Sequence, residues 1–188
     1  MDQVEIAPQK AHRIERVIMH WTGGQHAVSE NNIEHYHEIV SGDGVRVLGK
    51  CCAEDNLDLT TNAFAAHTRN LNAGSVGLAM ACMLGAVEAP FEIGDFGMTD
   101  RQLDVFCKMV AEYCLRYRIP VTEWTVLSHA EVQPTLDVKQ TGKWDITVLP
   151  GMSYVGDPVA IGDILRDHIR AEVRALEANQ DAYVARPL

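Results

Sequence analysis

Two histidines and an aspartate, far apart in the chain, have the side-chain types of a metal centre. His20 follows the apolar residues 17–19, and His129 follows the apolar residues 124–127 after one serine. Asp145 comes later, in a stretch that also contains glycine and lysine. Two imidazoles and one carboxylate leave a fourth position for water, as in catalytic zinc sites. The pattern indicates a hydrolytic metal site, although histidines that only complete or cap buried strands would give the same pattern.

A second histidine pair is an alternative. His35 and His37 are two residues apart, and in a strand both imidazoles would lie on one face, where they could bind a metal. From the residues alone, the two pairs are equally acceptable. The five cysteines are weaker candidates, because none of them forms a Cys-x-x-Cys pattern.

The segments around these residues alternate between strand and helix patterns. Residues 16–21, 75–84 and 124–128 are short and apolar, which predicts buried strands, with the second at the centre of a sheet. In open α/β sheets, ligands bind at the carboxyl ends of the strands. We therefore expect His20 and His129 at this edge of the sheet.

A hairpin is predicted near the second histidine pair. Residues 36–40 and 45–48 flank the sequence Ser-Gly-Asp-Gly, which favours a tight turn. In the first strand, Tyr36 and Glu38 would face one side of the sheet and His37 the other. The hairpin needs an antiparallel pair, so the predicted fold is α/β, with a central mixed β-sheet flanked by helices.

Two helices are expected to cover this sheet. Thr99 and Gln102 suggest a capping box at the start of residues 99–118, and Asp157 followed by Pro158 marks the start of the other helix. Each helix has an apolar stripe at helical spacing: Leu103, Phe106, Val110, Tyr113 and Tyr117 in the first, and Ile161, Leu165, Ile169, Val173 and Leu176 in the second. The stripe ends near residue 177, where we expect fraying.

The remaining segments are expected to be loops. Residues 22–32 would lie over the site, residues 51–64 would line a groove, and a loop broken by Pro134 and Gly142 would follow His129. The chain is interpreted as one domain, residues 1–188, with its core at about 14–176, a polar lead-in and a C-terminal tail.

The composition of the chain indicates which partners and which compartment to expect. The chain has 16 Lys and Arg against 26 Asp and Glu, a formal net charge of -10, which argues against nucleic acid or an anionic membrane as a partner. The first residues lack a basic and apolar leader, and no apolar run is long enough to span a membrane. The cysteines show no regular spacing, which favours synthesis in a reducing, cytoplasmic compartment.

Taken in order, several short motifs resemble those of a known family. The chain contains Val17-Ile18-Met19-His20-Trp21-Thr22, Tyr36-His37, His67 with Asn72 and Ser75-Val76-Gly77-Leu78, Ser128-His129-Ala130-Glu131, and Lys143-Trp144-Asp145. Over about residues 16–150 this set resembles the zinc-dependent N-acetylmuramoyl-L-alanine amidases, which include phage amidase-type lysozymes, bacterial cell-wall amidases and animal peptidoglycan recognition proteins. The resemblance implies the amidase or peptidoglycan recognition protein fold. It also implies hydrolysis of the amide bond between N-acetylmuramic acid and L-alanine in peptidoglycan.

The resemblance also implies a ligand set. His20, His129 and Asp145 match the positions that bind zinc in the family, so Zn²⁺ is the expected cofactor. His37 then becomes a packing or supporting residue.

Five further residues receive expected roles from the same resemblance. Tyr36 and Lys143 match an active-site tyrosine and lysine, and both are expected to act on the oxyanion that forms during amide hydrolysis. His67 matches a groove histidine that contacts substrate, and Asn72 and Trp21 are expected to bind substrate with it.

One departure from the family concerns the strand at residues 75–81. Some members carry a glutamate there, whereas this chain has no acidic residue in that strand. The chain therefore resembles the phage lysozyme type, which uses tyrosine and lysine, and the identity of the general base stays open.

Three classes of function remain at this point: an enzyme, a module that binds muropeptide without turnover, and a structural component of a phage or secretion particle. The retained ligands, Tyr36 and Lys143 favour an enzyme, because binding alone does not require an open zinc. The residue pattern favours a phage or prophage endolysin that reaches the cell wall when released. The alternative is a cytosolic muropeptide-recycling amidase. We expect a monomer whose partner is peptidoglycan or muropeptide.

Overall fold

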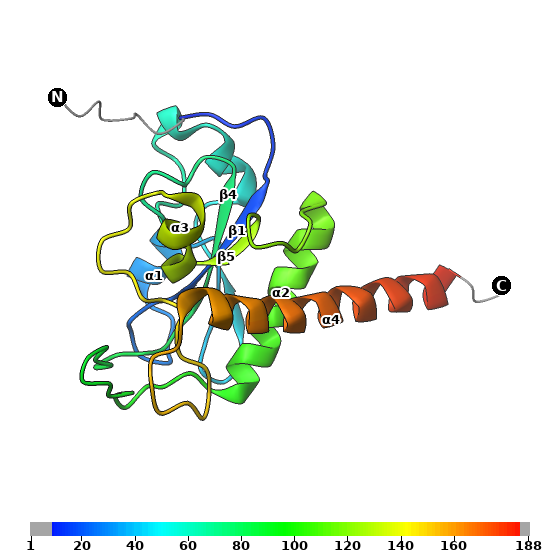
Figure 1. Cartoon of the computed structure of the whole chain (residues 1–188). Helices are drawn as coiled ribbons and strands as arrows, with labels where there is room; N and C mark the ends of the chain where they lie inside the picture. Colours follow the sequence, from blue (N-terminus) through cyan, green and yellow to red (C-terminus); the bar gives the residue numbers. More distant parts are fainter. Residues whose placement is uncertain (1–8, 185–188) are drawn as a thin grey trace.

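The computed structural model describes residues 9–184, with side chains as far as residue 179. Its centre is a five-stranded sheet in the order β3-β2-β4-β1-β5 (Figure 1). The strands are β1 (Arg16–Trp21), β2 (Glu38–Val40), β3 (Arg46–Leu48), β4 (Ser75–Met80) and β5 (Val126–Ser128). All neighbouring pairs are parallel except β2 and β3. The predicted α/β fold with a mixed sheet is confirmed.

Helices cover both faces of this sheet. They are α1 (Glu30–His35), α2 (Asp100–Tyr117), α3 (His129–Leu136) and α4 (Pro158–Val184), with two short 3-10 helices, η1 (Ala53–Leu57) and η2 (Leu59–Thr61). Figure 1 shows α2 and α4 on one side of the strands and α1 and α3 on the other. Most of α4 beyond its contact with α2 extends away from the rest of the protein.

The large hydrophobic core lies between the sheet and the pair α2 and α4. Successive residues of a strand point to opposite faces, so alternate residues of β1 and β4 enter this core. They are Val17, Met19 and Trp21 from β1, and Val76, Leu78 and Met80 from β4. They pack against the predicted helix stripes, whose residues are either buried in this core or partly buried against it. β4 is buried along its whole length and central, as predicted, although it ends at Met80.

The opposite face of the sheet carries two smaller apolar clusters. Ile18 packs with residues of β5 and α3 in one, and Ile39 packs with Ala79 in the other. His20 lies on this face of β1, in register with Ala79 of β4. The face that holds the candidate ligands is therefore separate from the main core.

Two predicted loops contain α-helices instead, and the predicted loop at residues 51–64 contains the short helices η1 and η2. Residues 30–35 form α1, because Ser29 and Asn32 make a reciprocal capping box. The hairpin strand β2 consequently starts at Glu38, and His35 belongs to the helix. The loop predicted after His129 is wrong for its first part, which is α3. Ser128 and Glu131 cap this helix, and the Glu131 carboxylate accepts a hydrogen bond from the Ser128 N–H at 2.7 Å, which favours a helix even with Pro134 inside it.

The two long helices, α2 and α4, begin at the predicted residues. Thr99 caps α2, but the Gln102 side chain does not complete the capping box; it donates instead to the carbonyl oxygens of Val40 and Ala81. α4 continues beyond its apolar stripe and is helical to Val184, and fraying of this end stays a prediction.

The start of the described chain packs against the short helix η1. Residues 1–8 of the predicted lead-in lie outside the described part of the chain. From Lys10 the chain is tied to η1 and its flank, through an ion pair with Asp58 and a backbone hydrogen bond from Ala11 to Leu57. All five cysteines are free thiols. None of the described helices has a stretch both long and apolar enough to cross a bilayer.

Candidate metal centre

The register of two parallel strands brings the histidines together. Ile18 of β1 pairs with Leu127 of β5, and Met19 pairs with Ser128. His20 and His129 directly follow this last pair, so they lie side by side. His20 is the fifth residue of β1, and His129 is the first residue of α3. Their Nδ1 atoms are 3.1 Å apart.

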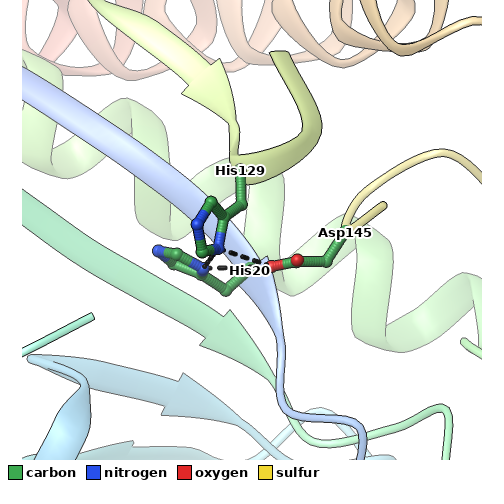
Figure 2. Close-up of side chains that lie close together, drawn as sticks. All are labelled: His20, His129 and Asp145. Atoms are coloured by element: carbon green, nitrogen blue, oxygen red, sulfur yellow. Dashed lines mark hydrogen bonds and ion pairs between the residues drawn. The ribbon is translucent and has the colours of Figure 1, made fainter. Parts of the chain in front are cut away.

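Asp145 reaches the same point from the segment that follows α3 (Figure 2). Its Oδ2 lies 3.1 Å from Nδ1 of His20 and 3.3 Å from Nδ1 of His129. The backbone carbonyl of Asp145 accepts a hydrogen bond from the N–H of Ala130 at 2.6 Å, which holds the segment against the start of α3. The exposed fractions of His20, His129 and Asp145 are 0%, 3% and 7%.

The three atoms have the spacing of a zinc ligand set. A tetrahedral zinc with bonds of about 2.0–2.1 Å has ligand atoms about 3.3 Å apart, and the three edges here are 3.1, 3.1 and 3.3 Å. The two Nδ1 atoms and the carboxylate oxygen point at one another, so there is little space for a proton on each of them. The residues present therefore fit a zinc ion, and each contributes one ligand atom.

The protonation states suit the same role. Burial lowers the pKa of His20 to about 4, against the opposing effect of Asp145, so this imidazole is neutral at pH 7. Burial opposes ionisation of Asp145, but its contacts with His129 and His20 outweigh that cost and hold its pKa below the usual range. A neutral imidazole and an ionised carboxylate are the ligand forms that a metal requires.

The second nitrogen of each candidate ligand histidine has a polar partner. Nε2 of His20 lies 3.3 Å from both Nδ1 of His67 and Oγ1 of Thr68. Nε2 of His129 lies 2.9 Å from Oε1 of Gln140. Such partners fix the orientation of metal-binding imidazoles.

The alternative pair His35 and His37 is not a metal site in this structure. His35 is exposed on α1, where its Nδ1 contacts the carbonyl of Asn31. His37 is buried, and both of its ring nitrogens are occupied. Nδ1 accepts a hydrogen bond from the N–H of Gly77 at 2.9 Å, and Nε2 lies 3.1 Å from Oδ1 of Asn56. His37 is a packing residue, as the family resemblance implied.

Tyr36 lies beside the ligand atoms. It follows α1 directly, and its ring centroid is 5.2 Å from that of His20. Burial, and then the negative charge of Asp145, raises the pKa of the Tyr36 hydroxyl well above its usual value. The hydroxyl therefore stays protonated and can donate a hydrogen bond.

Lys143 lies at the exposed edge of the site, two residues before Asp145. It lines a surface hollow of about 530 Å³ beside α3, together with Gln133 and Pro158. Its positive charge makes a small contribution to the lowered pKa of His20, after burial and the other charged neighbours of that ring. Among the described side chains, the Lys143 ammonium has no hydrogen-bonding partner.

His67 lies behind His20, with an exposed fraction of 8%. Its Nε2 is 3.4 Å from the carbonyl oxygen of Ser75. The ring occupies the space that a side chain at position 77 would fill, because a Cβ on Gly77 would overlap it. His67 thus supports His20, and its role in substrate binding remains a prediction.

The other two predicted substrate residues are also engaged inside the protein. Oδ1 of Asn72 accepts hydrogen bonds from the N–H groups of His67 and Thr68, which shapes the loop behind His20. Trp21 is buried in the main core, where its ring centroid is 4.8 Å from that of Trp144. Substrate contact by Asn72 and Trp21 likewise remains a prediction.

The sequence analysis did not identify Thr68 or Gln140 as partners of the histidines, or Gly77 as the position against which the His67 ring packs. A glycine inside an apolar strand often marks a close approach, so Gly77 did carry a signal. Thr68 and Gln140 are ordinary polar residues of irregular segments, and no periodicity or motif singles them out.

Comparisons with known proteins identify a family model and several similar structures. A family model described as N-acetylmuramoyl-L-alanine amidase matches residues 10–151. The Ph2119 endolysin from the Thermus scotoductus MAT2119 bacteriophage Ph2119 is 12% identical, with a TM-score of 0.50 over 87% of this chain and 92% of that one. The N-acetylmuramoyl-L-alanine amidase LysC from Clostridium intestinale URNW is 17% identical, with a TM-score of 0.47 over 85% and 89%.

A third similar structure contains a ligand. It is the N-acetylmuramyl-L-alanine amidase AmiD from E. coli with the substrate anhydro-N-acetylmuramic acid-L-Ala-D-gamma-Glu-L-Lys, which is 15% identical, with a TM-score of 0.47 over 69% of this chain and 53% of that one. At these identities the likeness concerns the fold alone. A comparison with curated proteins finds no match.

Proposed function

The chain belongs to the N-acetylmuramoyl-L-alanine amidase family, and from that premise we propose that it is a zinc-dependent amidase that cleaves the bond between N-acetylmuramic acid and L-alanine in peptidoglycan. The observation that carries the proposal is the convergence of Nδ1 of His20, Nδ1 of His129 and Oδ2 of Asp145 within 3.3 Å of one another. A single domain would carry the whole activity.

His20, His129 and Asp145 would hold the zinc ion through two imidazole nitrogens and one carboxylate oxygen. Bound there, zinc would supply a Lewis acid that activates water and polarises the amide carbonyl. The three ligand side chains are buried, so little bulk water surrounds them, and electrostatic interactions among them are stronger than in water.

Tyr36 is proposed as a hydrogen-bond donor to the carbonyl oxygen of the substrate. Its hydroxyl remains protonated because burial and Asp145 raise its pKa. A donor that meets an oxygen as negative charge develops on it lowers the energy of the transition state more than that of the bound substrate. Tyr36 would therefore contribute to turnover more than to affinity.

Lys143 is proposed to stabilise the same developing charge from the exposed side of the site. It is exposed and without a partner among the described residues, so its ammonium is free to turn toward a bound substrate. A positive charge placed opposite a developing oxyanion lowers the energy of the transition state.

A binding module without turnover is the competing proposal. Recognition alone does not need a neutral His20 and an ionised Asp145 that converge with His129, so the ligand set favours an enzyme. We propose that the protein serves as a phage or prophage endolysin that acts on the cell wall after release. The likeness to the Ph2119 endolysin and the absence of an acidic residue in β4 support this role.

Digestion of purified sacculi tests the activity. The full chain, supplied with zinc, should release stem peptides with a free L-alanine amino terminus, which mass spectrometry identifies. The His129→Ala variant should release none, whereas His35→Ala, which changes an exposed histidine on α1, should behave like the wild type. Binding to sacculi without any released peptide would favour the binding module.

A further inference from the structure

We infer that Gln140 is a positioning residue of the candidate metal centre, because its side-chain amide holds His129 in one tautomer. In that tautomer the proton is on Nε2, and the lone pair of Nδ1 faces His20 and Asp145. The inference rests on the proposed function for its link to zinc. Its structural part concerns only the contacts of Gln140 and His129.

The orientation of the Gln140 amide is determined by the backbone of a neighbouring loop. Its Nε2 lies 2.7 Å from the carbonyl oxygen of Arg69. A carbonyl oxygen can only accept a hydrogen bond, so the amide NH₂ group must lie on that side. The amide oxygen must then face His129.

The tautomer of His129 follows from this orientation. Oε1 of Gln140 lies 2.9 Å from Nε2 of His129, and an amide oxygen can only accept. Nε2 of His129 therefore carries the proton. In a neutral imidazole Nδ1 is then unprotonated, which is the form that binds a metal.

Gln140 is held firmly enough to impose this choice. Its exposed fraction is 7%, so water does not compete for the amide. Its backbone N–H donates to Oε1 of Gln133 at 2.8 Å, which ties the residue to α3. Gln140 is thus linked at once to α3, to the loop at Arg69 and to His129.

His20 is supported by the same loop but in a different way. Its Nε2 has two possible partners, His67 and Thr68, each at 3.3 Å. Among the described residues, Nε2 of His129 has one side-chain partner, the Gln140 amide oxygen, and this distance is shorter, at 2.9 Å. Loss of the Gln140 amide should therefore affect His129 more than loss of one partner affects His20.

Two readouts on the full chain test the inference, with three variants. Gln140→Met keeps the length of the side chain but removes both the donor and the acceptor. Gln140→Glu keeps an acceptor for His129 and loses the donor to Arg69. Gln133→Leu is the matched control, because it loosens the same segment without touching His129.

The first readout is the zinc dissociation constant, measured by competition with a chelating dye. Gln140→Met should weaken zinc binding by about 10- to 100-fold, the usual effect of losing an outer partner of a ligand histidine. Gln140→Glu should recover most of that loss, and Gln133→Leu should change the constant little. Equal weakening in Gln140→Met and Gln133→Leu would overturn the inference, because loop order would then explain the effect.

The second readout is the tautomer of His129 in the zinc-free chain, from two-bond proton–nitrogen NMR correlations of the ring. The wild type and Gln140→Glu should show the Nε2–H form, and Gln140→Met should show a mixture of tautomers. This readout does not depend on metal binding. If the wild type binds no zinc but shows this tautomer pattern, the positioning role stands and the zinc proposal fails. Observation of the Nε2–H tautomer alone in Gln140→Met would overturn the positioning role.

Discussion

Nδ1 of His20 lies 3.1 Å from Nδ1 of His129, although the two residues are 109 positions apart in the chain. The parallel pairing of β1 with β5 produces this contact, because Met19 pairs with Ser128 and a histidine follows each of them, His20 within β1 and His129 at the start of α3. Two ring nitrogens that face each other cannot both present lone pairs without repulsion. A shared cation relieves that repulsion, and the first prediction follows from it.

We predict one zinc ion per chain in protein purified without added metal. His129→Ala removes one of the three ligand atoms and should lose most of the bound zinc, since a site with two ligands binds much more weakly. Elemental analysis measures the metal content. His35→Ala is the control, and equal zinc in the wild type and His129→Ala would reject the assigned ligand set.

Lys143→Ala should lower kcat by roughly 10²-fold or more while zinc remains bound, because the lysine stabilises charge that develops only in the transition state. The assay combines the rate of amide cleavage with zinc content. Lys139→Ala, which removes another exposed lysine of the same segment, should leave the rate nearly unchanged. Normal turnover in Lys143→Ala would show that Lys143 is only a solvated charge.

Tyr36→Phe keeps the ring beside His20 and removes the hydroxyl. Turnover should fall by about 10- to 1,000-fold if the hydroxyl donates to the developing oxyanion or relays a proton. Affinity for muropeptide should change much less, because this interaction strengthens only in the transition state. Cleavage rate and affinity should be measured side by side; an unchanged rate would remove Tyr36 from the mechanism.

Gly77→Ala should disturb the support of His20. A Cβ at this position overlaps the His67 ring, which packs against the strand at that point. Overpacking of this kind costs about 1–3 kcal/mol of stability, and displacement of His67 should also weaken zinc binding. Thermal unfolding and zinc titration test the two effects. Wild-type values for both would show that the His67 ring can move without consequence.

Arg166→Met should destabilise the fold by about 3–5 kcal/mol, because it leaves the Glu131 carboxylate buried without its cation. Nη1 of Arg166 lies 2.8 Å from Oε1 of Glu131, and both side chains are fully buried between α3 and α4. Urea unfolding measures the change. The double variant Glu131→Gln with Arg166→Met should recover part of the stability; no recovery would assign the loss to packing of Arg166 alone.

The apolar pattern of the chain determined the sheet and where the histidines lie on it. Residues 16–21 form β1 with the predicted bounds, and the helix stripes of α2 and α4 all reach the core. A short continuous apolar run indicates a strand buried on both faces, and apolar residues repeating with period 3.6 indicate a helix, so such segments are encoded locally. The positions of His20 and His129 at the end of buried strands followed from the same pattern.

Tertiary structure alone decided how the irregular segments meet these strands. Asp145, Gln140 and His67 lie in segments without periodicity, and their places depend on contacts with residues far away in the chain. The Gln140 amide contacts the backbone of Arg69, and the carbonyl of Asp145 contacts the N–H of Ala130. Buried polar groups must find partners wherever the fold supplies them, and that supply is set by the packing of the whole chain rather than by neighbouring residues.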